Sequence, residues 1–172
     1  KNLSFSEKYD KFPWLNNEDN FISWSKGQTG VPIIDAAMRQ LNATGWMHNR
    51  LRMIVAMYLT KNLLIDWRKG EKYFMNKLID GDFASNNGGW QWSASTGVDA
   101  APYFRIFNPI TQSEKFDKEG KFIKKWIPEI AAAKNIHDPS TEERREMGYS
   151  CHLVDLKESR KEAIEAFSSF SK

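Results

Sequence analysis

Apolar residues recur at helical spacing in several stretches of the chain. A helix is predicted to begin at Pro32, which suits the first turn, and to run to about Leu41, with Gly45 as a stop signal. Similar stripes predict further helices at roughly residues 46–65, 70–79, 121–126 and 156–170. No segment alternates apolar and polar residues for long enough to indicate a strand. The pattern therefore predicts an all-α fold.

Two stretches lack such a stripe. Residues 1–20 are polar and hold Pro13 and the cluster "NNEDN", so they are predicted to be irregular. Residues 80–112 are rich in Gly, Asn, Ser and Pro, which predicts a long ordered loop with short helical turns. Loops of that length are uncommon in a compact domain unless they carry function. We therefore expect the functional site in residues 80–112, which include "NNGGWQW" (Asn86 to Trp92).

Composition adds a size and a class to this picture. The chain has 172 residues, 41% of them hydrophobic, which is enough for one domain with a real core and excludes disorder by composition. The formal net charge of +3 is a mild bias that neither demands nor excludes nucleic-acid binding. Seven tryptophans exceed what a small core usually requires. Some of them are therefore free to stack on a ligand.

Several chemistries find no support in the sequence. The single cysteine, Cys151, forms no intrachain disulfide, and no apolar run is long enough to span a membrane, so we expect a cytoplasmic protein. His48, His137 and His152 lie far apart without paired ligands, which argues against a metal site and favours structural roles. Cys151 beside His152 is not by itself a nucleophilic arrangement, and neither a Walker loop nor a Rossmann glycine fingerprint occurs.

Candidate polar residues gather in two places. On the helix predicted from residue 46, one face holds Trp46, Asn49, Arg52, Met53 and Ala56, opposite an apolar stripe. This face is either an ordinary solvated surface or the wall of a site.

After the third predicted helix, Asp80 and Asp82 flank Gly81, and Arg52 with Asp80 is a plausible ion pair. Helix capping and turn formation are the alternative roles of the two aspartates. The pair Gly88 and Gly89 either lets the backbone approach a flat ligand or forms an ordinary turn.

Taken together, five motifs carry a specific resemblance. The sequences "TGWMHNR", "DWRKGEKYF", "LIDGD", "NNGGWQW" and "YFRIFNP" occur in this order. Residues 24–109 resemble the flavin-binding helical domain of the DNA photolyase and cryptochrome family, and "TQSEKFDKEGKFIKKWIPE" continues the resemblance. Within that family, "WMHNR" and "NNGGWQW" are typical of class I cyclobutane pyrimidine dimer photolyases.

The resemblance implies a function and roles for individual residues. Members of the family use reduced FAD and light to pass an electron to a pyrimidine dimer that is flipped out of DNA. The residues that it implies for FAD binding are Asn49, Arg52, Asp80, Gly81, Asp82 and Asn86. The implied electron relay runs from Trp14 at the surface through Trp67 to Trp90 beside the flavin, although core packing is an alternative role for Trp14 and Trp67. The residues implied for substrate and DNA are Asn49, Arg50, Met53, Trp92 and Gln112.

The chain also departs from the family pattern. Family members are far longer, with an N-terminal α/β domain that holds a folate or deazaflavin antenna. We therefore expect residues 1–172 to be the C-terminal part of the FAD-binding domain, in a protein that is monomeric and binds damaged DNA. The segment "GYSCHLVDLKESR" also lacks the usual prolines. A cryptochrome-like flavin photoreceptor and a non-catalytic helical DNA-binding fragment remain alternatives, although Asn86 and "WMHNR" favour repair.

Overall fold

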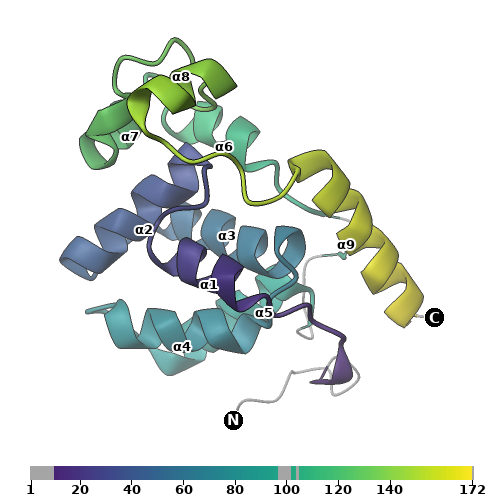
Figure 1. Ribbon diagram of the computed structural model, residues 1–172. Helices are drawn as coiled ribbons and strands as arrows, with labels where there is room; N and C mark the ends of the chain where they lie inside the picture. Colours follow the sequence, from purple (N-terminus) through teal and green to yellow (C-terminus); the bar gives the residue numbers. More distant parts are fainter. Residues whose placement is uncertain (1–9, 97–101, 104, 172) are drawn as a thin grey trace.

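The protein is a bundle of short helices in the part of the chain that the structure describes. This computed structural model describes residues 10–96, 102–103 and 105–171. Those residues contain no strand, so the all-α prediction is confirmed for them. The elements, shown in Figure 1, are α1 (Glu18–Ser25), α2 (Pro32–Thr44), α3 (Asn49–Met57), the π-helix η2 (Tyr58–Asn62), α4 (Trp67–Lys77), α5 (Phe83–Ala94), α6 (Pro109–Phe116), α7 (Lys121–Trp126), the 3₁₀ turn η3 (Pro128–Ile130), α8 (Thr141–Met147) and α9 (Leu156–Ser171).

Helices α2, α3, α4 and α5 pack around the main hydrophobic core. In Figure 1, α2 and α3 lie above α4 and α5, the short helices α6, α7 and α8 gather at the top, and α9 stands at the right. The core between them holds fully buried side chains such as Trp24, Ile34, Met38 and Trp67. A second, smaller cluster lies under α9.

The helix α2 follows its sequence signals closely. Pro32 occupies its first turn, and Gly45 ends it in the left-handed conformation (φ 74°), where its N–H bonds to the carbonyl oxygen of Leu41. A side chain at position 45 would also collide with Ile79. Gly45 therefore ends the helix as predicted, and the last helical residue is Thr44.

The single helix predicted over residues 46–65 is wrong at both ends. It begins at Asn49, because Nδ1 of His48 accepts a hydrogen bond from the N–H of Arg50 at 3.0 Å and caps the first turn. Trp46 therefore lies outside the helix that was predicted to carry it. The last turn widens into η2, where the N–H of Leu63 bonds to the oxygen of Tyr58, five residues back.

The loop predicted over residues 80–112 is mostly wrong, because it contains the helix α5 and the first turn of α6. Asp82 caps α5 and Asn108 caps α6, which are start signals that the glycines and prolines obscured. The motif "NNGGWQW" is thus helical. The rest of this predicted loop falls partly on residues 97–101 and 104, which lie outside the described part of the chain.

Two further helices occur where the sequence predicted none. Residues 1–20 were predicted to be irregular, but α1 begins at Glu18, because the side chain of Asn17 caps it by accepting from the N–H of Asn20. Residues 1–9 lie outside the described part of the chain. The other helix, α8, begins after Ser140, whose hydroxyl accepts from the N–H of Glu143.

Candidate functional site

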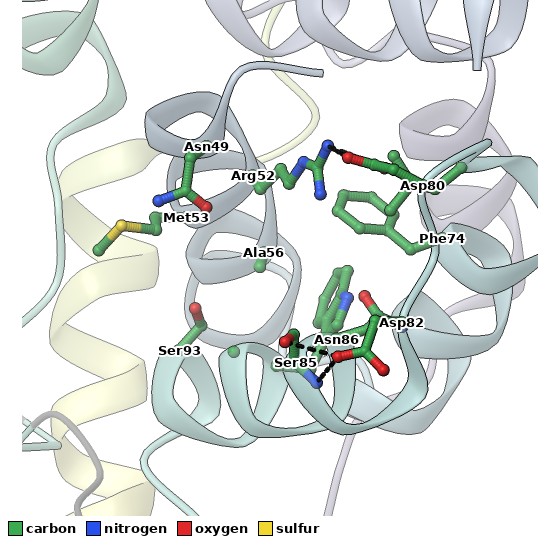
Figure 2. A pocket seen from close by; sticks show the side chains of 13 residues that line it. Asn49, Arg52, Met53, Ala56, Phe74, Asp80, Asp82, Ser85, Asn86 and Ser93 are labelled. Carbon is green, nitrogen blue, oxygen red and sulfur yellow. Dashed lines mark hydrogen bonds and ion pairs between the residues drawn. The ribbon is translucent and has the colours of Figure 1, made fainter. Parts of the chain in front are cut away.

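A cavity of about 320 Å³ opens between α3 and α5. Along α3 its wall is made by residues three or four positions apart, which is one face of that helix. The same spacing holds along α5, and α4 contributes to the floor. The lining residues, most of them labelled in Figure 2, are Asn49, Arg52, Met53 and Ala56 from α3, Phe74 from α4, Leu78, Asp80 and Asp82 from the segment after α4, and Ser85, Asn86, Gly89, Trp90 and Ser93 from α5.

Arg52 and Asp80 meet at the rim of this cavity. Nη2 of Arg52 lies 3.2 Å from both carboxylate oxygens of Asp80, as Figure 2 shows, and its Nε donates to the carbonyl oxygen of Met47 at 2.7 Å. The predicted pair is therefore present, but it is not buried: the two side chains are 26% and 54% exposed. Such a pair adds little to stability because water screens it. Its effect is to hold a guanidinium in a fixed position at the opening.

Asp82 opens α5 at the other side of the cavity. Its carboxylate accepts from the N–H of Ser85 at 3.2 Å and from the Ser85 hydroxyl at 2.7 Å. The predicted alternative of helix capping is therefore correct for Asp82, although the residue also lines the cavity. The first turn of α5 faces this region, so the positive end of its dipole lies near the cavity.

Asn86 is held by a network that reaches α4. Its Nδ2 donates to the main-chain oxygen of Glu71 at 3.0 Å, and Asn87 donates to the Glu71 carboxylate at 2.6 Å. Gln91 in turn donates to Oδ1 of Asn87 at 2.8 Å. Burial raises the pKa of Glu71, and the hydrogen bond from Asn87 partly offsets that rise. The amide N–H₂ of Asn86 is therefore engaged, and its oxygen is the atom left to accept from a ligand.

Trp90 forms the apolar floor of the cavity with Phe74. Their ring centroids lie 4.9 Å apart at 80°, and Trp24 packs behind Trp90 at 5.9 Å. The Trp90 ring rests on the backbone of α4 at Gly70, where a Cβ atom would come within 2.2 Å of the ring. Only glycine at position 70 permits this contact.

The two glycines of α5 behave differently from Gly70. A Cβ atom at Gly88 or Gly89 would meet no described heavy atom within 4 Å. Gly89 lines the cavity and is exposed, so its missing side chain leaves bare backbone at the wall. The predicted ordinary turn is wrong, since both residues are helical. Close approach of a ligand to this backbone stays a prediction.

The structure brings together about half of the residues that the sequence indicated for a site. Those that line the cavity are Asn49, Arg52, Met53, Asp80, Asp82, Asn86 and Trp90. Gly81, Arg50, Trp92, Gln112, Trp67 and Trp14 lie outside its lining. Trp67 is fully buried in the main core, Trp14 is half-buried, and Arg50 is exposed. Trp92 is half-buried, and its ring lies 6.5 Å from that of Phe107.

The cavity also has residues that the sequence did not predict. Phe74, Leu78, Ser85, Gly89 and Ser93 line the cavity, and Glu71 supports it from below. The signal for Ser85, Gly89 and Ser93 was their helical spacing from Asp82, which becomes visible only when the segment is recognised as a helix. Glu71 gave no signal, because a glutamate in a charged helix is usually solvated.

Like His48, which caps α3, the other two histidines have structural partners. Nδ1 of His137 lies 2.7 Å from the hydroxyl of Ser113, and Nε2 of His152 lies 3.0 Å from a carboxylate oxygen of Asp138. Within the residues that the structure describes, no group of three acidic, histidine or cysteine side chains is placed to hold a metal ion.

None of the helices described here has the length and apolar character needed to cross a membrane.

Comparison with known proteins gives one consistent result. Residues 1–169 match the family described as the FAD-binding domain of DNA photolyase. Among curated relatives, the deoxyribodipyrimidine photo-lyase of Escherichia coli is 54% identical over all of this chain and 38% of its own length, and that of Vibrio cholerae is 54% identical over 98% of this chain and 37% of its own.

Solved structures are similar over nearly the whole chain. A class III photolyase from Agrobacterium tumefaciens superposes with a TM-score of 0.91 at 44% identity, over 98% of this chain and 37% of that one. A cryptochrome from Synechocystis superposes with a TM-score of 0.84 at 38% identity, over 91% of this chain and 34% of that one. This chain therefore spans little more than a third of the length of the relatives that it matches.

Proposed function

Because the chain belongs to the family of FAD-binding domains of DNA photolyase, we propose that its cavity holds the flavin of a light-driven enzyme that repairs cyclobutane pyrimidine dimers in DNA. The observation that carries this proposal is the Asn86 amide, which lies in the cavity wall with its N–H₂ bonded to Glu71 and its oxygen left as an acceptor. An acceptor fixed in this way suits the N–H edge of a reduced flavin ring.

The cavity fits a flat heteroaromatic ring in its chemistry. Its floor of Trp90 and Phe74 is apolar, and its rim carries a cation, two carboxylates and amides that can pair with ring heteroatoms. The bare backbone at Gly89 adds room at the wall. Asn49, Arg52, Asp80, Gly81, Asp82 and Asn86 are the residues that we propose to bind FAD.

Within this proposal the protein supplies position and electrostatics. FAD bound in its reduced form would supply light absorption and the single electron needed for opening the cyclobutane ring. Arg52, held by Asp80 and by the Met47 carbonyl, would offer a positive charge to a cofactor bound in the cavity. The buried floor excludes water from the side where Trp90 lies.

Trp14, Trp67 and Trp90 are proposed to form the electron relay. Trp90 lines the cavity, Trp67 is buried in the same core, and Trp14 is half-buried at the edge of that core. A partly exposed Trp14 with Trp67 and Trp90 shielded from solvent suits inward transfer of an electron from the surface to the cavity wall. Phe74 and Trp24 surround Trp90 and keep water from it.

Residues outside the cavity floor are proposed to hold the damaged DNA. Asn49 and Met53 lie on the cavity face of α3, Arg50 is exposed next to them in sequence, and Trp92 and Gln112 are half-buried. Trp92 would stack on the flipped dimer, and Arg50 would contact phosphate. Affinity for DNA should fall as salt rises, since phosphate contacts release counterions.

The proposal extends to the whole protein to which such a domain belongs. We propose that residues 1–172 act as the C-terminal part of the FAD-binding domain, together with an α/β domain that holds a folate or deazaflavin antenna. That protein would be a cytoplasmic, monomeric, DNA-associated enzyme. The relatives, which are nearly three times as long as this chain, support this extension.

A flavin photoreceptor is the second candidate. The similarity to a Synechocystis cryptochrome favours it. Asn86 and "WMHNR" favour repair. The two functions differ in whether light changes the DNA or only the protein.

Illumination of the flavin-loaded, reduced protein with thymine-dimer DNA tests the proposal. Repair restores the absorbance of the two thymine rings near 260 nm, in proportion to light dose. A photoreceptor would leave that absorbance unchanged while its own flavin spectrum responds to light. Unrepaired DNA under these conditions would remove the repair function.

A further inference from the structure

The helix α9 covers the segment that carries Trp14. A second hydrophobic cluster forms between them, with the buried side chains Phe12, Leu64, Ala163 and Phe167. The Phe167 ring meets the ring of Trp14 at 6.1 Å and 75°, and Phe12 stacks on Phe167 at 4.3 Å. In Figure 1 this helix stands at the right of the molecule, and it packs on η2. Its inner face therefore packs on Trp14 and Phe12 as well as on η2.

The π-helix η2 fastens α9 in place. Nδ2 of Asn62 donates to the hydroxyl of Ser159 at 3.0 Å, and the ammonium of Lys61 lies 4.4 Å from the centroid of the Phe167 ring. Lys61 also donates to the Ser95 hydroxyl at 2.6 Å and to the carbonyl oxygen of Tyr103 at 3.1 Å. Phe167 is thus packed between the Lys61 amino group and two aromatic rings, and it is fully buried.

The indole nitrogen of Trp14 is enclosed, although part of the ring is exposed. Its Nε1 is buried and has no hydrogen-bond partner among the described residues. A buried indole N–H normally finds an acceptor. In the described part of the chain no side chain accepts the proton of this N–H, and the nitrogen is shielded from bulk water.

We propose that α9, through Phe167, controls the access of water to Nε1 of Trp14 and thereby the loss of the indole proton once Trp14 has been oxidised. This inference rests on the relay in the proposed function. In the relay, Trp14 gives one electron to oxidised Trp67 and becomes a radical cation. Its N–H then passes a proton to a water molecule, which leaves a neutral indole radical and a hydronium ion.

Proton loss decides the fate of the separated charge. While the proton stays on Nε1, the electron can return to Trp14 from Trp67. After the proton has left, return requires a proton as well, and a thiolate in solution can instead donate an electron while water returns the proton. Phe167 is therefore a positioning residue, since it acts on Trp14 by excluding water.

Hydrogen exchange at the indole N–H tests, without any flavin, whether α9 controls the access of water to Nε1 of Trp14. The protein is labelled with ¹⁵N-tryptophan, and exchange with solvent is followed for Trp14 and for Trp67, whose Nε1 is also buried without a described partner. Phe167→Ala and the milder Ser159→Ala should speed exchange at Trp14 by about tenfold or more, through local opening of α9, and leave Trp67 unchanged. Phe167→Leu, which keeps the apolar cover, is the matched control.

Two results would overturn the claim that α9 controls the access of water to Trp14. One is an unchanged Trp14 exchange rate in both variants. The other is equal acceleration at Trp14 and Trp67, which reports loss of the whole fold instead of release of α9. If Phe167→Ala does not fold, Ser159→Ala decides, because it removes one hydrogen bond to Asn62 and leaves the rings in place.

Transient absorption of the flavin-loaded protein tests whether α9 also controls the loss of the indole proton from oxidised Trp14. After a light pulse, conversion of the Trp14 radical cation to the neutral radical should be faster in Phe167→Ala than in Phe167→Leu. Equal rates would overturn the inference and leave the relay intact. If exchange at Trp14 accelerates but the light pulse produces no Trp14 radical in any variant, the relay itself is wrong. The role of α9 in proton loss is then wrong with it.

Discussion

The side-chain amide of Asn86 is bonded through Nδ2 to the main-chain oxygen of Glu71, 3.0 Å away on the neighbouring helix. This contact fixes which end of the amide faces the cavity. It also joins α5 to α4 beside the buried Glu71 carboxyl group, which Asn87 holds from the same helix. One residue of α4 therefore positions two consecutive side chains of α5.

Replacement of the Asn86 donor tests this clamp. Asn86→Asp should lower the free energy of unfolding by about 1–3 kcal/mol at pH 8, since a carboxylate cannot donate to the Glu71 oxygen. The loss should shrink at low pH, where the introduced carboxyl is protonated and can donate. Chemical denaturation at several pH values measures it. Asn76→Asp, at an exposed position of α4, is the control and should change stability by less than about 0.5 kcal/mol.

The contact between Gly70 and the Trp90 ring predicts opposite effects of one substitution at two glycines. Gly70→Ala should destabilise the protein by about 1–3 kcal/mol or more, because its Cβ would overlap the ring. Gly88→Ala should stabilise it by about 0.5–1 kcal/mol, since the site is helical and open. Denaturant unfolding measures both. Similar effects at the two positions would show that Trp90 does not rest on α4.

Lys61 predicts a rise in stability with pH. Burial lowers its pKa from 10.5 to about 7. Between these values the unfolded chain binds a proton that the folded protein does not, so the free energy of unfolding increases as pH rises. We expect an increase of about 1–3 kcal/mol between pH 7 and pH 9, which Lys61→Met should abolish. Lys124→Met, at an exposed lysine, should leave the slope intact.

The relay assignment predicts a separation of two activities. In the flavin-loaded protein, Trp90→Phe should block light-driven reduction of the oxidised flavin and leave repair by chemically reduced protein intact. Absorbance spectra under illumination measure the first activity, and repair of thymine-dimer DNA measures the second. Normal photoreduction in this variant would show that Trp90 is not the donor beside the cavity.

Trp92 should behave in the opposite way. Trp92→Ala should weaken binding to dimer-containing DNA by about 1–3 kcal/mol, because it removes a stacking surface for the flipped base. Photoreduction of the flavin should persist. Titrations with damaged and undamaged duplexes measure the effect, and unchanged affinity for damaged DNA would exclude stacking on Trp92.

The sequence predicted a helix correctly where the residues that favour and end it lie within the helix's own segment. For α2, the stripe, Pro32 and Gly45 all lie within one segment, so the sequence predicts the helix and its stop. For α5 the local signals point the other way, because two glycines lower helix propensity by about 1 kcal/mol each. That helix is stabilised by contacts distant in sequence, such as Trp90 on Gly70 and Asn87 on Glu71, which no local pattern contains.

In the site, too, the sequence predicted a contact that residue types indicate and missed one that depends on tertiary packing. Arg52 with Asp80 was predicted from charge and position, and the two side chains do meet. Glu71 was missed because its role depends on burial between two helices. The resemblance assigned Trp14 an exposed end of the relay, and the structure adds the cover of α9, which the helical stripe of residues 156–170 alone could not place.

The π-helix η2 makes the number of residues between α3 and α4 a structural requirement. In an ordinary helix each residue advances by about 100°, so one residue fewer between Tyr58 and Asn62 would turn everything beyond it by that angle. The cavity face of α3 would keep its direction, but Asn62 would rotate away from Ser159 on α9. A single deletion here would rotate Asn62 and Ser159 out of register, whereas replacing either side chain leaves the backbone register of η2 unchanged.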